Sequence, residues 1–352
     1  MGLDTPYPAG VLPLLADQAD AAARELPPEV HDYYAGGSWD EVAVVEAEPA
    51  WRRTRLRPHV LRDVSTVDVA LDLLGTRLST PVLVAPTALH GLAHPDGERA
   101  TAQGTADAGS LLVLSTRSSV PLEQVPAGPW WLQVYVMRDR GLTRALVQRA
   151  AGAGATALVL TGDTPHVAVK KRTGAPPRGL EHLANLAQHL VSGKGADDVE
   201  QDPSAGLSVV RELADASGLP VLVKGVLRGD DARACLDAGA AGVVVSNHGG
   251  RQLDRAVPSA QALPEVADAV GDDGAVLVDG GLRSGLDVLT ALALGARAVL
   301  VGRPVLWALA AGGPDGVRAC LSSLTDDLAR AMALAGATRL SDVTRDIIAP
   351  GR

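Results

Sequence analysis

Short apolar runs recur along most of the chain, separated by stretches that mix apolar and polar residues. The runs are rich in Val and Leu and do not alternate with polar residues, which is typical of parallel strands buried on both faces. Eight of them stand out, at residues 81–85, 111–114, 131–135, 157–160, 220–223, 242–245, 275–278 and 298–301. The pattern therefore predicts eight buried strands.

Helix-like segments lie between most of these runs, for example at residues 141–151, 230–238 and 284–294. A glycine commonly stands just before the next strand, as at Gly109 and Gly239, where it ends a helix because it accepts a left-handed backbone at little cost. Strand and helix thus alternate, which predicts an α/β fold closed into a (β/α)8 TIM barrel. An open, doubly wound sheet is the alternative.

The chain is expected to form one domain over residues 1–352, since a barrel takes about 250 residues and extensions supply the rest. Residues 1–75 are interpreted as a helical extension that covers the bottom of the barrel or one mouth. Residues 172–205 interrupt the pattern after the fourth strand. They are rich in Gly, Pro and Asp around an amphipathic stretch at 180–190, which indicates a lid or surface loop.

Charge and composition narrow the class of partner. The net charge of −9 argues against nucleic acid, which requires a basic face. No stretch reaches about 18 uninterrupted apolar residues, and no basic start precedes an apolar run, so neither a membrane span nor a signal peptide is expected. We therefore expect a cytoplasmic protein. Cys235 and Cys320 lack a CxxC partner, so no metal site is expected.

Reactive side chains directly follow the predicted strands. In a (β/α)8 barrel the active site lies at the C-terminal ends of the strands, so these side chains should converge. They are Thr87, Ser115, Thr116, Gln133, Tyr135, Thr161, Asp163, Lys224, Ser246, His248, Asp279 and Arg303.

Two of these strand ends have the composition of a phosphate site. Asp279-Gly-Gly-Leu-Arg283 follows the seventh strand and Gly302-Arg303 follows the eighth. Glycines let backbone N–H groups approach an anion, arginine offers a charged fork, and barrels often bind phosphate at this place. Tight turns with surface arginines are the alternative.

The run Ser246-Asn-His-Gly-Gly-Arg-Gln-Leu-Asp254 resembles the active-site signature of the FMN-dependent 2-hydroxy-acid oxidases and dehydrogenases. That family includes glycolate oxidase, lactate oxidase and mandelate dehydrogenase. The likeness covers nearly the whole chain except residues 172–205. It also includes the segments 26–27, 32–34, 85–88, 93–98, 133–135, 223–225, 277–281 and 301–304.

The resemblance implies FMN as the cofactor and the oxidation of an (S)-2-hydroxy acid to the 2-oxo acid, with O2 or another acceptor taking the electrons. His248 would be the base and Asp163 would orient it, while Arg251 would bind the substrate carboxylate. Tyr33 and Tyr135 would hydrogen-bond the substrate. The residues expected to bind FMN are Thr87, Ala88, Ser115, Gln133, Thr161, Lys224, Ser246, Asp279, Gly281, Arg283, Gly302 and Arg303. A homo-oligomer, a tetramer by family analogy, is also implied.

The chemistry of the reaction supports these roles independently. Oxidation of a 2-hydroxy acid requires a base, an acceptor for two electrons and a cation for the carboxylate. Histidine titrates near neutrality and can accept the proton. No amino-acid side chain accepts a hydride, so a cofactor must do so.

Two positions depart from the family pattern. Lys170 stands where the family has a second arginine, and lysine cannot make the planar bidentate contact with a carboxylate. Lys171 or Arg172 could replace it if the loop shifts. Arg117 stands at a position that is often aromatic. Either it points to solvent or pairs with an acidic residue, or it enters the pocket and favours a substrate with a second anionic or strongly polar group.

Three hypotheses about function follow. The first is an oxidase or dehydrogenase of a 2-hydroxy acid. The second is a tailoring enzyme of the same family that oxidises an unusual, larger or peptide-derived substrate. The third is a flavin-binding barrel without catalysis, against which the joint presence of His248, Asp163, Arg251 and Tyr135 argues.

Overall fold

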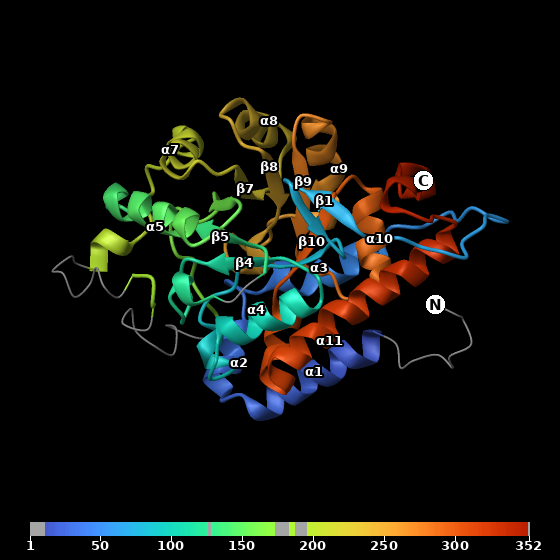
Figure 1. Ribbon diagram of the computed structural model, residues 1–352, viewed down its shortest axis with the longest axis horizontal. Coiled ribbons are helices and arrows are strands. Elements are labelled where there is room, and N and C mark those ends of the chain that lie inside the picture. Colours follow the sequence, from blue (N-terminus) through green and yellow to red (C-terminus); the bar gives the residue numbers. More distant parts are fainter. Residues whose placement is uncertain (1–10, 126–127, 173–182, 187–195, 351–352) are drawn as a thin grey trace.

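A closed barrel of eight parallel strands forms the centre of the protein (Figure 1). The computed structural model describes residues 11–125, 128–172, 183–186 and 196–350. The barrel strands are β3 (Val82–Val84), β4 (Leu112–Ser115), β5 (Trp130–Val134), β6 (Leu158–Thr161), β7 (Val221–Val226), β8 (Gly242–Val245), β9 (Ala275–Asp279) and β10 (Ala298–Val301). They follow one another in chain order, and β10 pairs with β3 to close the ring. The predicted TIM barrel is confirmed, and the open sheet is wrong.

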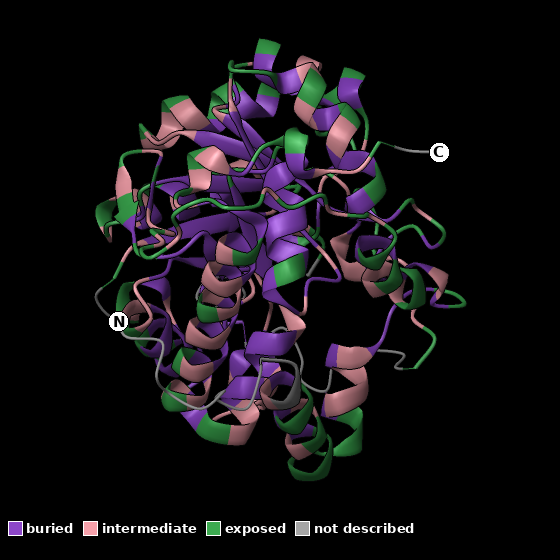
Figure 2. Ribbon diagram, turned by 90° about the vertical axis from the view of Figure 1, so that its right-hand side faces the viewer, coloured by how far each residue is buried: buried purple, intermediate pink, exposed green. Residues whose placement is uncertain are grey.

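Both faces of the strands are buried, as their uninterrupted apolar composition predicts (Figure 2). Alternate residues point to opposite faces. Leu83, Trp131 and Leu222 belong to one apolar cluster inside the barrel. Val82 and Val84 belong to a second cluster between the strands and the surrounding helices.

Helices follow the strands and cover the outside of the barrel (Figure 1). They are α4 (Glu98–Asp107), α5 (Arg140–Gly152), α7 (Ser208–Ser217), α8 (Gly229–Asp237), α9 (Ser259–Val270), α10 (Gly285–Ala293) and α11 (Arg303–Ala335). The side chain of Asp139 caps α5 and that of Ser284 caps α10, by accepting hydrogen bonds from free N–H groups of the first turn. The helices predicted at 141–151, 230–238 and 284–294 correspond to α5, α8 and α10.

The N-terminal extension reaches both ends of the barrel. It contains α1 (Val11–Glu25), which lies along α11, followed by α2 (Pro28–Ala35) and α3 (Val42–Arg52). A hairpin of β1 (Leu71–Leu73) and β2 (Thr76–Leu78) was not among the sequence predictions. Its leucines join the apolar cluster inside the barrel and close the N-terminal end. Near the other end, α2 brings Tyr33 and Tyr34 to the cavity described below.

The segment 172–205 is described at residues 172, 183–186 and 196–205, so most of the amphipathic stretch at 180–190 lies outside the described residues. The described parts pack against the loops after β4 and β5. The Asn185 side chain accepts a hydrogen bond from the Leu122 amide (2.9 Å), and Gln201 forms a β-bridge with Met137. The segment includes the 3-10 turn η4 (Ala196–Val199).

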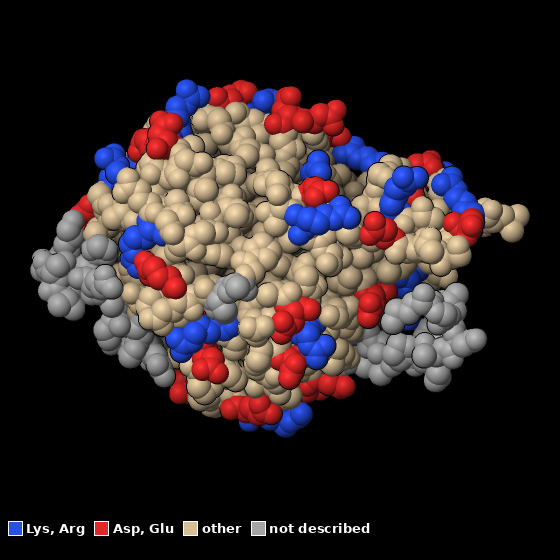
Figure 3. All heavy atoms as spheres, viewed as in Figure 1, with Lys and Arg blue, Asp and Glu red and all other residues tan. Residues whose placement is uncertain are grey.

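No helix in the described parts of the chain combines the length and apolarity needed to cross a membrane. On the face drawn in Figure 3, acidic and basic side chains are interspersed around the periphery.

Candidate active site

A cavity of about 470 Å3 lies at the C-terminal ends of the barrel strands, a size typical of small-molecule sites. Most of the site residues predicted from the sequence line it together. They are Tyr33, Thr87, Ala88, Ser115, Arg117, Gln133, Tyr135, Thr161, Lys170, Lys224, His248, Arg251, Asp279, Gly281, Arg283, Gly302 and Arg303. Asp163 and Ser246 do not line the cavity; they contact His248 and Lys224, which do.

His248 and Asp163 form a pair at the ends of β8 and β6. The Nδ1 atom of His248 lies 2.9 Å from Oδ1 of Asp163. Burial lowers the pKa of His248, opposed by Asp163, so the imidazole is neutral near pH 7. Burial raises the pKa of Asp163. His248 outweighs this effect through its charge and its hydrogen bond, so the pKa of Asp163 is lowered overall. An ionised Asp163 holds the proton on Nδ1, which leaves the Nε2 lone pair of His248 free to accept a proton.

The backbone after β8 turns sharply to present this imidazole. His248 has a φ of 58°, an uncommon left-handed conformation for a residue with a side chain. Gly249 and Gly250 continue the turn with φ values of 62° and 71°. A Cβ atom on Gly250 would lie 2.8 Å from the backbone nitrogen of Val44. The two glycines of the signature are therefore required by backbone geometry and by the close approach of α3.

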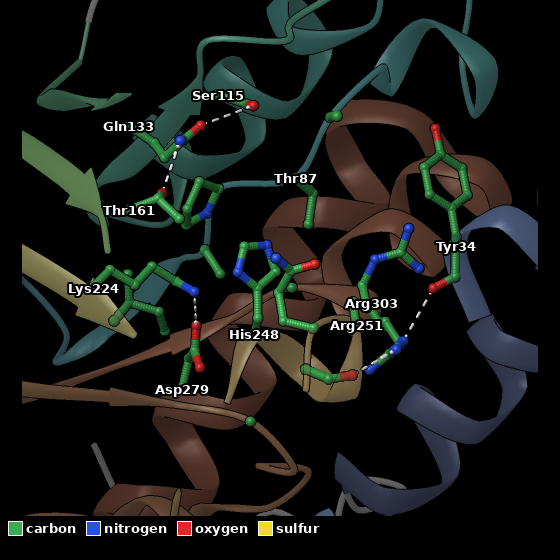
Figure 4. A pocket seen from close by; sticks show the side chains of 18 of the residues that line it. Tyr34, Thr87, Ser115, Gln133, Thr161, Lys224, His248, Arg251, Asp279 and Arg303 are labelled. Atoms are coloured by element: carbon green, nitrogen blue, oxygen red, sulfur yellow. Dashed lines mark hydrogen bonds and ion pairs between the residues drawn. The ribbon is translucent and has the colours of Figure 1, made fainter. Parts of the chain in front are cut away.

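A buried ammonium group stands beside the pair. The Nζ atom of Lys224 lies 3.1 Å from Oδ2 of Asp279 (Figure 4). It also donates to Oγ of Ser246 at 2.9 Å. Burial disfavours its charge, but Asp279 and then Asp163 raise the pKa of Lys224 overall. Lys224 is therefore a fixed cation in the wall of the cavity.

A chain of hydrogen bonds centred on the Gln133 side chain orients the polar groups on another part of the cavity wall. Gln133 donates from Nε2 to Thr161 Oγ1 at 2.9 Å, and its Oε1 accepts from Ser115 Oγ at 3.2 Å (Figure 4). Three adjacent strands, β4, β5 and β6, thus present an oriented polar surface at their C-terminal ends.

Arginine side chains gather after β9 and β10, with too few anions to balance them. The Arg303 guanidinium is held by backbone oxygens, including those of Tyr34 (3.1 Å) and Gly249 (2.9 Å). Burial, then the charges of Arg251 and Arg283, lower the pKa of Arg303 from its ordinary value. A bound anion would relieve this repulsion, which is what a phosphate site requires.

Arg251 and Lys170 lie side by side near α2. Arg251 donates to the carbonyl oxygens of Tyr33 (2.7 Å) and Gly36 (2.8 Å), and the Lys170 ammonium donates to the carbonyl of Arg251. Burial, then Arg251 and Arg303, lower the pKa of Lys170 to about 8. Arg172 instead pairs with Glu41 at 2.9 Å and does not line the cavity, so the interpretation that Arg172 replaces the missing arginine is wrong.

Arg117 enters the cavity. Its guanidinium carbon lies 5.0 Å from the centroid of the Tyr135 ring, within cation–π range. The interpretation in which Arg117 points away into solvent is wrong.

The sequence analysis missed several residues of the wall, among them Tyr34, Thr164, Gln201 and Gln252. Tyr34 and Gln252 lie inside the motifs that carry the resemblance and could have been named from them, and Thr164 directly follows Asp163, a residue that the sequence analysis did name. Gln201 lies in the divergent segment 172–205, where no motif gave a signal.

The barrel and this cavity define an enzyme of the flavin-dependent oxidoreductase class, and comparison with known proteins agrees. Residues 22–350 match the family model described as FMN-dependent dehydrogenase, and the chain belongs to this family. It is 45% identical to 4-hydroxymandelate oxidase of Amycolatopsis orientalis, over 92% of this chain and 94% of that protein. It is 43% identical to an L-lactate oxidase of a Nostoc species, over 94% of this chain and 96% of that protein. A crystal structure of mandelate oxidase superposes with a TM-score of 0.87 at 44% identity, covering 94% of this chain and 96% of that one.

The protein is therefore an FMN-dependent oxidoreductase that acts on a CH–OH group, as the sequence predicts. The hypothesis that the protein is an enzyme is confirmed, and the alternative of a flavin-binding barrel without catalysis is not supported.

The residues present fit FMN. The cation-rich end can take its phosphate, and Oδ1 of Asp279 is a buried acceptor without a hydrogen-bond partner among the described residues, available to a ribityl hydroxyl. Gly281 has a φ of 79°, and a Cβ there would lie 2.3 Å from the carbonyl oxygen of Ala47. Only glycine at position 281 therefore allows the backbone to pass this close to Ala47 beside the proposed phosphate site.

Proposed function

We propose that the enzyme oxidises an (S)-2-hydroxy acid to the 2-oxo acid and passes the electrons to O2 or another acceptor. FMN, when bound, supplies the acceptor for two electrons. The names of the relatives, an L-lactate oxidase and a 4-hydroxymandelate oxidase, support a 2-hydroxy acid as substrate. The observation that carries the proposal is the His248–Asp163 pair at 2.9 Å, on a cavity that also contains Arg251.

Substrate binding is assigned to Arg251, Lys170 and two tyrosines. Arg251 takes the substrate carboxylate, and Lys170 adds a second positive charge beside it. Tyr33 and Tyr135 both line the cavity and can offer hydroxyl groups to the substrate. Burial raises the pKa of Tyr135, which keeps its hydroxyl protonated and able to donate.

Proton removal is assigned to His248. Its neutral imidazole accepts a proton from the substrate, and Asp163 stabilises the imidazolium that results. The mutual dependence of the two pKa values supports this, because a protonated His248 gains the attraction of an ionised carboxylate at 2.9 Å.

Cofactor binding is assigned to the remaining residues of the wall. Arg283 and Arg303 would hold the phosphate, and Asp279 would accept hydrogen bonds from ribityl hydroxyls. Lys224 is a fixed cation in the cavity wall and would favour negative charge on a bound flavin. Gln133, Thr161 and Ser115 supply oriented polar groups for the edge of the ring system.

Anaerobic mixing of the purified FMN enzyme with a panel of 2-hydroxy acids tests the proposal. At least one (S)-acid should bleach the flavin absorbance, and its (R)-enantiomer should do so much more slowly. If no acid of the panel bleaches a fully FMN-loaded enzyme, the proposed activity is wrong.

A further inference from the structure

The cavity carries more positive charge than FMN and a simple 2-hydroxy acid can balance. Two of its cations have carboxylate partners: Lys224 lies 3.1 Å from Asp279, and Arg283 lies 3.1 Å from Glu48. Four cavity cations have no carboxylate within ion-pair distance among the described residues, namely Arg117, Lys170, Arg251 and Arg303. The FMN phosphate supplies about two negative charges, and the substrate carboxylate supplies one. About one positive charge is left over.

The surplus charge can be located. Arg251, Arg303 and Lys170 form one group, since the ammonium of Lys170 contacts the backbone of Arg251, and Arg251 and Arg303 both donate to the carbonyl of Gly36. Arg117 is separate from that group. It projects from the loop after β4 and lies over the ring of Tyr135, 5.0 Å from its centroid. The phosphate and the reacting carboxylate are assigned to the first group, so Arg117 is the cation left without an anion.

A second donor without a partner lines the same cavity. Gln201 lines the cavity, and its Nε2 atom is buried with no acceptor among the described residues. The backbone holds it there, because Gln201 forms a β-bridge with Met137, and the Asp202 amide donates to the Val136 carbonyl at 2.8 Å. The segment 201–202 is thus tied to the residues that directly follow Tyr135. A buried amide without an acceptor is costly, and a ligand oxygen would satisfy it.

We propose that Arg117, assisted by Gln201, binds a second carboxylate on the side chain of the substrate, so that the enzyme prefers dianionic 2-hydroxy acids. This inference rests on the proposed oxidation of a 2-hydroxy acid and adds its substrate class. Arg117 lies over the ring of Tyr135, and both line the same cavity as His248 and Arg251. One substrate molecule in this cavity can therefore present one carboxylate to Arg251 and the other to Arg117.

The test compares acids of matched shape on the FMN-loaded enzyme. The dianions are (S)-malate and (S)-2-hydroxyglutarate, and the apolar monoanion is (S)-2-hydroxypentanoate. A polar monoanion carries an amide in place of the distal carboxylate of 2-hydroxyglutarate. For at least one dianion, kcat/KM of flavin reduction should exceed that of the monoanion and of the amide by tenfold or more. A native enzyme that prefers the monoanion or the amide over both dianions overturns the proposal without any variant.

Variants assign the preference to a residue. Arg117→Met removes the charge and keeps the length of the side chain, and it should lower kcat/KM for the preferred dianion about 10- to 150-fold, as for loss of a charge-assisted hydrogen bond. The change for 2-hydroxypentanoate should be under threefold. Arg117→Lys should restore part of the loss, and Gln201→Leu should cause a smaller loss that is again selective for the dianion. Equal losses on both kinds of acid contradict the proposal.

Arg138→Met is the matched control. Arg138 is exposed, pairs with Glu200 at 3.6 Å and does not line the cavity, but it lies next to Met137 and changes the net charge by the same amount. Arg138→Met should leave kcat/KM unchanged for both the dianion and the monoanion. If Arg138→Met reproduces the effect of Arg117→Met, the preference comes from the overall charge and not from a bound carboxylate.

Binding without turnover separates this proposal from the proposed activity. Titration of the oxidised enzyme with 2-oxoglutarate and 2-oxopentanoate, followed by the flavin absorbance, should give tighter binding of 2-oxoglutarate, and Arg117→Met should abolish the difference. If no 2-hydroxy acid reduces the flavin, the proposed activity fails, yet this titration still decides whether Arg117 binds a second carboxylate. Equal affinities in the native enzyme overturn the inference.

Discussion

The charge of Lys170 should make substrate capture depend on pH between about 7 and 9. An arginine at this place would stay charged at all working pH values, but burial and two neighbouring cations lower the pKa of Lys170 to about 8. Below this pKa the ammonium attracts the substrate carboxylate, and above it the attraction is lost. The value of kcat/KM should therefore decline as the pH rises through about 8.

The size of this decline follows from the titration. A group with this pKa is roughly nine-tenths charged at pH 7 and roughly one-tenth charged at pH 9. A hydrogen bond between a charged donor such as the partly buried Lys170 and a carboxylate contributes about 1.5–3 kcal/mol. Together these values give a fall in kcat/KM of roughly five- to tenfold between pH 7 and pH 9.

The assay is kcat/KM of anaerobic flavin reduction between pH 5 and pH 10 in the native enzyme and in Lys170→Arg. The variant should lose the decline near pH 8. In both proteins kcat/KM should rise as the pH increases through the acid range, because His248 must be neutral to act as the base and burial places its pKa below the ordinary value. Lys171→Arg is the matched control, since Lys171 is exposed and does not line the cavity, and its profile should equal the native one. An unchanged basic decline in Lys170→Arg would refute the reasoning.

Three further predictions concern the cofactor and the base. Denatured enzyme should release FMN and not FAD, as identified by chromatography. Arg303→Met should weaken FMN binding about 10- to 150-fold in equilibrium dialysis, because a charge-assisted contact with the phosphate is lost. FAD in the extract, or an unchanged affinity for FMN, counts against the phosphate site. Asp163→Asn should slow flavin reduction in rapid mixing, but less than loss of His248 itself, since it removes only the charge that orients and stabilises the imidazole; a native rate would show that the 2.9 Å contact is not used. Gly281→Ala should lower the midpoint of thermal unfolding and the FMN content, because the new Cβ would lie 2.3 Å from the carbonyl oxygen of Ala47. The expected strain is about 1–3 kcal/mol. Full FMN content together with an unshifted midpoint would contradict this prediction.

The barrel could be predicted from the sequence because each of its strands is a short apolar run followed by a reactive residue. The convergence of Gly281, Arg283 and Arg303 on one cavity was predictable for the same reason, since they stand at fixed offsets from β9 and β10. The hairpin β1–β2 could not be predicted in this way. Its strands have three residues each, too few for a period of two to be recognised, and its leucines are held by the barrel interior rather than by local preference.

The substrate side of the cavity was less predictable because it depends on contacts between distant segments. Arg117 could be placed in solvent or in the pocket from the sequence alone, and only the position of the Tyr135 ring decides between them. Gln201 reaches the cavity through a backbone bridge to Met137, which no sequence pattern near Gln201 reveals. The exclusion of Arg172 likewise depends on Glu41, a residue of the N-terminal extension.

The assignment of His248 as the base is the central claim, and anaerobic rapid mixing of FMN-loaded His248→Ala with the best substrate tests it most directly. The variant should retain FMN, since the cofactor contacts lie on other residues, and flavin reduction should slow by about a hundredfold or more, as for loss of a general base. Flavin reduction at the native rate in a fully loaded His248→Ala enzyme would contradict the account.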